Sequence, residues 1–219
     1  MRPENAPGGD IDAPRADTDA ARGSITGAPA PTDTPAPTRK DRGTMPTDLT
    51  GTYRALDDGR CALRFGRVYD RPVEHVWRFV TDPGELWRWF PCPAEMELRP
   101  GGTVRFGADP ARPGGTGEVN AADPPRHVSF TWGPDELRFD LEPLAEVGTR
   151  FTFTDILGVP DTAARTAAGW EVCLTCLDAL ARGEHPTGPP TRPTPLWRRY
   201  YDGYVGAGLP SGAPVPDPD

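Results

Sequence analysis

The sequence predicts an α+β domain with an antiparallel sheet of about six to seven strands and one long C-terminal helix. Two observations predict this class. Six short segments between residues 94 and 157 are apolar on one face and are separated by turn residues, which is typical of strands joined by hairpins. After them, residues 161–183 repeat apolar side chains at the spacing of an amphipathic helix.

Composition places the folded part in the middle of the chain. Of the 29 prolines among 219 residues, eight lie within 1–50 and nine within 186–219. These ends lack the aliphatic residues that would offset the entropy of ordering the chain. We therefore predict three regions: a disordered Pro/Ala-rich leader over 1–47, a folded domain over 48–184, and a Pro/Gly-rich tail over 185–219 with a short aromatic helix near 195–206.

Charge and hydropathy exclude several classes of partner. The net charge is −8, and no run of lysine or arginine forms the basic patch that a nucleic-acid surface requires. No segment approaches the ~20 apolar residues of a membrane span, and no apolar signal segment opens the chain. Four cysteines without a secretion signal favour reduced thiols. We expect a cytoplasmic protein with no nucleic-acid or membrane partner.

The first predicted elements are one strand and two short helices. Residues 60–69, "RCALRFGRVY", alternate between two faces, which predicts a strand. The next segment, "RPVEHVWRFV", repeats apolar residues at i, i+3, i+4 and i+7, so Trp77 lies on the apolar face of a helix. Asp82 is a good N-cap for a second short helix, which brings Trp89 and Phe90 together.

Six strand segments follow, each bounded by turn residues. Their short linkers predict an antiparallel meander. "RPGGT" occurs twice, at 99–103 and 112–116, and in each case a strand rather than a helix follows, so both copies are predicted to be hairpin turns and not phosphate loops. The segments are 94–98, 103–107, 116–121, 127–132, 136–144 and 149–157.

The last helix is predicted to begin near Asp161 and to end at Gly183. It contains Cys173 and Cys176 at the spacing of redox and zinc motifs. The pair lies about a dozen residues into the helix, where the dipole that activates a redox thiol has faded. No second pair completes a four-ligand zinc site. We predict that Cys173 packs in the core, with an oxidisable thiol or a metal ligand as the alternatives.

Five stretches carry a resemblance to a known family: "RPVEHVWRFVTDPGELWRWF" (71–90), "MELRPGGTVRF" (96–106), "GEVNAADPPRHVSFTW" (117–132), "TRFTFTDIL" (149–157) and "GWEVCLTCLDAL" (169–180). In this order they resemble the START/Bet v 1-like (SRPBCC) superfamily, and more narrowly the homologues of the heat-shock protein 90 ATPase activator. The resemblance implies a helix-grip fold, in which a curved antiparallel sheet wraps around the C-terminal helix and two short helices follow the first strand. That fold hosts lipid carriers, cyclases and cochaperones.

The resemblance and the aromatic strand faces together predict a site for a small hydrophobic ligand between the sheet and the last helix. A solid core is the alternative, since aromatic stripes also fill protein interiors. No cofactor and no metal ion is expected. The residues predicted to line the site are Trp77, Trp89, Phe90, Phe130, Trp132, Phe139, Phe151, Phe153, Trp170, Cys173, Leu174 and Leu177.

Two other functions stay open. A cavity enzyme of the cyclase type would need an ionisable side chain that points inward, and Asp155 is the candidate. A protein-interaction or stress-response module related to the chaperone activators would need an exposed apolar patch. Residues 195–204, "PLWRRYYDGY", are the candidate, because Trp197, Tyr201 and Tyr204 share one helical stripe.

Overall fold

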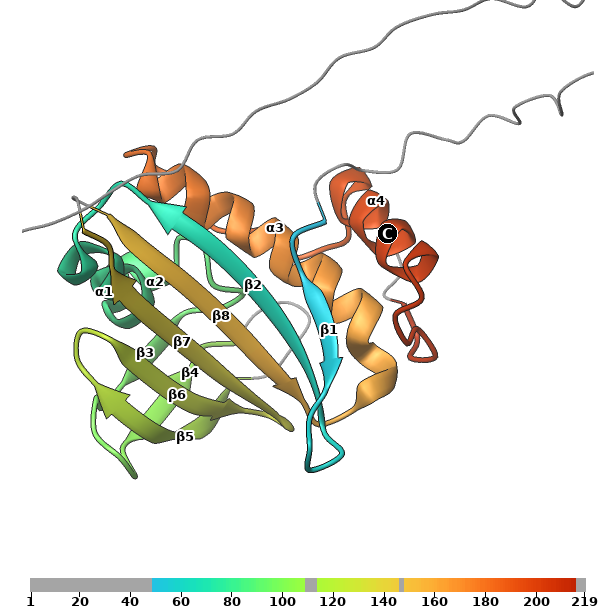
Figure 1. Cartoon of the computed structure of the whole chain (residues 1–219), viewed down its shortest axis with the longest axis horizontal. Helices are drawn as coiled ribbons and strands as arrows, with labels where there is room; N and C mark the ends of the chain where they lie inside the picture. The colour runs from blue at the N-terminus through green and yellow to red at the C-terminus, as the bar shows by residue number, and fades with distance from the viewer. Residues whose placement is uncertain (1–48, 109–113, 146–147, 216–219) are drawn as a thin grey trace, which may run out of the picture. The chain divides into compact units, whose positions relative to one another are not determined.

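The computed structural model describes residues 49–108, 114–145 and 148–215. Antiparallel strands form one curved sheet, and a long helix lies across one of its faces (Figure 1). Two short helices follow the first long strand. The predicted α+β helix-grip fold is therefore confirmed. The predicted leader, residues 1–47, lies outside the described residues.

In the described part of the chain the sheet contains eight strands, one more than the upper prediction. Their order is β1-β2-β8-β7-β6-β5-β4-β3, and every neighbouring pair is antiparallel. The consecutive pairing from the third to the eighth strand confirms the predicted meander. The strands are β1 (Thr52–Ala55), β2 (Cys61–Tyr69), β3 (Ala94–Met96), β4 (Thr103–Phe106), β5 (Gly115–Asp123), β6 (His127–Trp132), β7 (Asp135–Pro143) and β8 (Thr149–Leu157).

Four α-helices complete the described part of the chain. The two short helices lie at one end of the sheet, and the last helix lies beside the long one (Figure 1). They are α1 (Val73–Thr81), α2 (Pro83–Leu86), α3 (Ala163–Ala181) and α4 (Pro195–Gly206), with a short 3-10 turn, Pro160–Thr162, before α3.

Local sequence signals explain how several elements begin and end. The Asp82 carboxylate caps α2, because its Oδ1 accepts a hydrogen bond from the Gly84 N–H at 2.8 Å. In the first "RPGG" turn, Gly101 has a φ of +74°. A Cβ at Gly102 would lie 2.1 Å from the Glu97 carbonyl oxygen, so the hairpin requires glycine there. The Asp82 cap and the first hairpin turn are therefore confirmed, whereas the second "RPGG" copy begins outside the described residues.

The ends of α3 differ in how well the sequence predicts them. The helix begins two residues after Asp161, which lies in the 3-10 turn instead of capping the helix. At the other end, Gly183 has a φ of +86° and donates its N–H to the Leu180 carbonyl at 2.9 Å. The Glu184 N–H reaches the Ala179 carbonyl at 3.0 Å, which completes a Schellman motif.

The α3 helix is buried on two faces, whereas the sequence predicts a single apolar stripe. One face carries Trp170 and Leu174 against the aromatic side of the sheet. The other face carries Ala168 and Val172, which pack against Trp197 of α4 in a second buried cluster. The aromatic helix expected near 195–206 is therefore present, and it packs on α3.

A buried carboxylate joins α3 to both ends of the folded unit. The Glu171 side chain is 2% exposed. Its Oε1 accepts hydrogen bonds from the Thr50 N–H at 2.7 Å and from the Tyr204 hydroxyl at 2.6 Å. Arg67 of β2 lies 3.5 Å from Oε2. Because burial of an unpaired carboxylate is costly, these donors hold the segment before β1 and helix α4 in place.

We expect Tyr204→Phe to lower the free energy of unfolding by about 1–3 kcal/mol, the range for a hydrogen bond to a charged group. The substitution removes the hydroxyl that bonds Glu171 and keeps the ring that packs on α3. Urea unfolding followed by circular dichroism measures the change. Tyr200→Phe, on the same helix, is the matched control. Equal stability of the two variants would contradict the proposed importance of Glu171.

Candidate functional site

The twelve residues predicted to line a ligand site all belong to one core cluster between the sheet and α3. Eleven are buried, and Trp132 is partly buried at the end of β6. They come from α1, the turn after α2, strands β6, β7 and β8, and α3. The structure thus brings these residues together. Whether they bind a ligand stays a prediction.

Phe90 occupies the centre of this aromatic cluster. Its ring centroid lies 5.3 Å from that of Trp132 and 5.7 Å from that of Trp170. The rings of Phe106 and Phe130 each lie 6.5 Å away. These distances are those of direct aromatic contacts. Phe90 therefore fills the space between the sheet and α3, and it is carried by the turn after α2, not by a strand or a long helix.

Several further aromatic residues belong to the core cluster but were not predicted to line the site, and Phe106 and Phe65 are two of them. Phe106 of β4 contacts Phe130 at 6.1 Å, and Phe65 of β2 stacks on Phe153 at 5.8 Å. The alternation within their strands already placed each on an apolar face. That signal was sufficient to include them as lining candidates.

Asp155 is a fully buried carboxyl group within this interior. Its Oδ2 accepts a hydrogen bond from the Trp170 indole N–H at 2.7 Å. The aromatic ring of Phe153, two residues earlier on β8, lies 4.6 Å from the Trp170 ring. Asp155 therefore points inward, where a polar pair is surrounded by aromatic rings.

The two cysteines of α3 form no disulfide and lie in different environments. Cys173 is 4% exposed and belongs to the core cluster, while Cys176 is half-buried. Burial raises the pKa of the Cys176 thiol, which disfavours the reactive thiolate. Within the described ranges, no three His, Cys, Asp or Glu side chains are grouped so that they could hold a metal ion.

The aromatic stripe of α4 is not an exposed patch, contrary to the expectation for an interaction module. Trp197 is 9% exposed and Tyr204 is 1% exposed, because both face α3. A Cβ at Gly169 would lie 4.0 Å from the Trp197 indole nitrogen, so this glycine of α3 faces α4. Six large hydrophobic side chains of the described residues are exposed, and only the last two share an element, α4: Val68, Trp87, Leu98, Val159, Leu196 and Val205.

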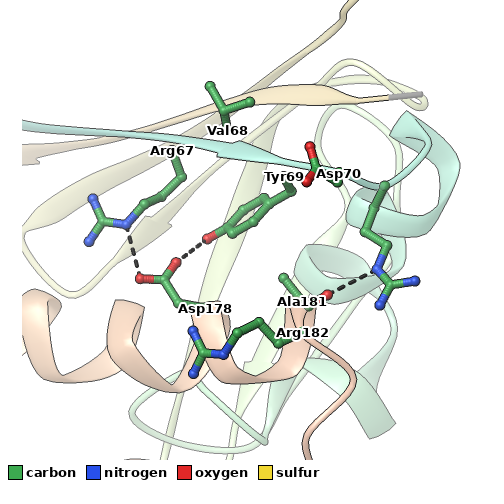
Figure 2. A pocket seen from close by; sticks show the side chains of 8 residues that line it. Arg67, Val68, Tyr69, Asp70, Asp178, Ala181 and Arg182 are labelled. Carbon is green, nitrogen blue, oxygen red and sulfur yellow. Dashed lines mark hydrogen bonds and ion pairs between the residues drawn. The ribbon is translucent and has the colours of Figure 1, made fainter. Parts of the chain in front are cut away.

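Two surface clefts lie between β2 and α3, with volumes of about 450 and about 380 Å³. Figure 2 shows Arg67 and Tyr69 pointing toward α3, where both bind Asp178. The Arg67 Nε lies 3.2 Å and the Tyr69 hydroxyl 2.8 Å from the carboxylate oxygens. None of the twelve predicted residues lines either cleft. The larger is lined by Arg67, Val68, Tyr69, Asp70, Arg71, Asp178, Ala181 and Arg182.

Two buried tyrosines should make the free energy of unfolding decrease at alkaline pH. Burial, reinforced by Asp178, raises the pKa of Tyr69, and burial with the Glu171 hydrogen bond raises that of Tyr204. In the unfolded chain both hydroxyls ionise near pH 10. Their contribution to stability is therefore complete below about pH 10 and is lost as the pH rises further. Unfolding free energies measured from pH 8 to 11 should fall less steeply for Tyr69→Phe than for the wild type, and equal slopes would contradict this.

Replacing Cys173 and Cys176 together by alanine should lower the free energy of unfolding, on the order of 1–3 kcal/mol for small buried side chains. The loss is expected from packing, because Cys173 lies in the core. Chemical denaturation measures the stability, and elemental analysis measures bound metal. Stoichiometric zinc in the wild type that disappears in the double variant would overturn this interpretation.

Solved structures with the same fold come from several bacteria. The crystal structure of CalU16 from Micromonospora echinospora has a TM-score of 0.55 and 24% identity, and the match covers 73% of this chain and 94% of that chain. A conserved protein of unknown function from Enterococcus faecalis has a TM-score of 0.59 and 22% identity, with 73% and 90% covered. A protein from Bordetella parapertussis has a TM-score of 0.52 and 22% identity, with 75% and 94% covered.

These likenesses establish the fold. The comparison with curated proteins gave no match. None of the helices in the described ranges is both long and apolar enough to cross a bilayer.

The family model of Activator of Hsp90 ATPase homolog 1-like protein matches residues 70–182, which is more than half of the 219 residues. The match extends from the end of β2 to the end of α3. The chain therefore belongs to this family, within the SRPBCC superfamily whose helix-grip fold it shares.

Proposed function

We propose that the protein binds a small hydrophobic molecule between the sheet and α3, in the space that the Phe90 ring fills. The position of Phe90 is the observation that carries the proposal. Its ring contacts aromatic side chains of β4, β6 and α3 at once. A flat apolar ligand in its place would make the same contacts.

The location of Phe90 in a turn supports the proposal that a ligand displaces its side chain. The residue lies in a turn after the four-residue helix α2, whereas its partners lie on long strands and on α3. The preceding residue, Trp89, is held separately, because its indole N–H donates to the Phe79 carbonyl at 2.7 Å. Rotation of Phe90 would therefore leave the hydrogen bonds of the sheet and of α3 intact.

Trp132 indicates where a ligand would enter. This residue is partly exposed and contacts Phe90 and Trp170, so the aromatic cluster reaches the surface there. Beyond these rings lies the hydrogen bond between Trp170 and Asp155. A ligand with one polar group would be oriented by that pair, as is usual for apolar sites that contain few polar side chains.

The other two functions have less support. The stripe proposed for protein interaction, including Trp197 and Tyr204, is packed against α3. For an enzyme, Asp155 is the inward-facing carboxyl group, and its Oδ2 already accepts the hydrogen bond of the Trp170 indole. Glu171, a second buried carboxylate of the described residues, is bonded by Thr50 and Tyr204. We therefore favour binding without catalysis.

Titration of the wild type with 1-naphthol, and with a panel of fatty acids, sterols and aromatic polyketides, tests the proposal. At least one compound should bind with a negative heat-capacity change, because apolar surface is buried, and should change tryptophan fluorescence through Trp132 and Trp170. Calorimetry and fluorescence measure these effects. If no compound in the panel changes fluorescence or melting temperature, the proposal fails.

A comparison of Phe90→Ala with Phe65→Ala distinguishes a ligand site from a solid core. Both rings are buried, but Phe65 stacks on Phe153 at the β2 side and Phe90 lies in the proposed site. If Phe90 is displaced by the ligand, Phe90→Ala should bind 1-naphthol more tightly than the wild type, while Phe65→Ala should not. Each is expected to lose up to about 3–5 kcal/mol of stability. Equal affinities in all three proteins would contradict displacement of Phe90.

A further inference from the structure

Asp155 interrupts an apolar row that crosses the inward face of the sheet. The strand register places it between Leu63 of β2 and Leu137 of β7. The row continues from Leu137 to Phe130 of β6 and then to Val119 of β5. All five side chains are 0% exposed. An apolar residue at position 155 would suit this row, because a buried carboxyl group loses its hydration.

The hydrogen bond to Trp170 does not by itself explain a carboxyl group at this position. The Asp155 Oδ2 accepts the Trp170 indole N–H at 2.7 Å. An indole donates one hydrogen bond, and a main-chain carbonyl is enough to accept it, as the Phe79 carbonyl does for Trp89 at 2.7 Å. A carboxylate has two oxygens with about four acceptor positions. Asp155 therefore offers more acceptor positions than the indole of Trp170 requires.

The apolar row connects the proposed ligand site with Asp155. The Phe130 ring lies 6.5 Å from the Phe90 ring. From Phe130 the row crosses Leu137 to Asp155, a distance of two strand spacings or about 10 Å. On the α3 side, Trp170 covers the same interval, because its ring lies 5.7 Å from the Phe90 ring and its N–H bonds to Asp155. A ligand that replaces the Phe90 ring and extends along Trp170 therefore reaches the Asp155 carboxylate.

We propose that Asp155 selects the polar end of the ligand: the site takes a flat apolar molecule with a hydroxyl or amino group, which donates a hydrogen bond to the Asp155 carboxylate. This inference rests on the proposed function and names the class of molecule that the same site binds. A carboxylate accepts hydrogen bonds and donates none. A ligand whose polar end only accepts would bring two acceptors together, and an anionic ligand would add a like charge. Aromatic alcohols and amines are therefore favoured, and fatty-acid anions are disfavoured.

Three naphthalene derivatives with the same ring system test this selection on the wild type. 1-Naphthol carries a donor, 1-methoxynaphthalene carries only an acceptor, and 1-naphthoate carries an anionic acceptor. Isothermal titration calorimetry measures each Kd. 1-Naphthol should bind at least tenfold more tightly than 1-methoxynaphthalene, as expected for one hydrogen bond to a charged group, and 1-naphthoate should bind most weakly. Equal affinities for 1-naphthol and 1-methoxynaphthalene would overturn the inference and leave the proposed function standing.

Two variants distinguish the carboxylate from the shape of the site. Asp155→Leu combined with Trp170→Phe removes both partners of the buried hydrogen bond, so that neither is left without the other. This double variant should bind 1-naphthol and 1-methoxynaphthalene with equal affinity. Trp170→Phe alone is the matched control, because it keeps the carboxylate. Its affinity for both compounds should fall, since a ring that lines the site is smaller, but the preference for 1-naphthol should remain.

The remaining outcomes also decide between the two proposals. A preference for 1-naphthol that persists in the double variant would show that shape rejects the methyl group, and would overturn the role of Asp155. Circular dichroism verifies that each variant folds, and the wild-type comparison decides alone if the double variant does not. If none of the three naphthalenes binds while another compound of the wider panel does, the inference fails and the proposed function stands. If no compound of the panel binds, both fail.

Discussion

Much of this fold depends on the burial of α3 on two sides at once. The sheet covers one face, and α4 with the segment before β1 covers the other. Glu171 lies at this second contact, and its carboxylate needs donors because burial removes water. Thr50, Gly51 and Tyr204 supply them from elements at the two ends of the folded unit. Displacement of either element would remove hydrogen bonds from the Glu171 carboxylate.

The sequence predicts the central elements well because their signals are local. Alternation identifies β2 and β8, and the Asp82 cap and the Gly183 terminus follow from short-range chemistry. Strand β1 was missed, since its four residues, "TYRA", are mostly exposed and have no apolar face. The contact between α4 and α3 was also missed. It depends on long-range packing, because Trp197 meets Val172 across a proline-rich connection that has no periodic pattern.

Local sequence patterns also explain which features of the aromatic interior could be predicted. Strand alternation and helical spacing place the twelve candidate residues on inward faces, and the structure groups them. The alternation of apolar residues does not show how the aromatic rings pack against one another. Their packing depends on Phe90, which lies in a turn without a periodic sequence pattern. Its ring contacts residues of β4, β6 and α3. The central ring of the cluster is thus positioned by the least regular segment around it.

The pairing of β2 with β8 has a consequence for folding during synthesis. Cys61 pairs with Leu157, and Tyr69 pairs with Thr149, so the intervening chain must leave the ribosome before β2 acquires its main partner. Hairpins from β5 to β8 join neighbours in sequence and can form early, whereas such distant pairing closes a long loop and is slow. Until that moment the side of β2 that will pair with β8 is open, and β1 covers only residues 61–64 on the other side. A nascent chain therefore carries an apolar strand, "CALRF", that needs protection from association with other chains.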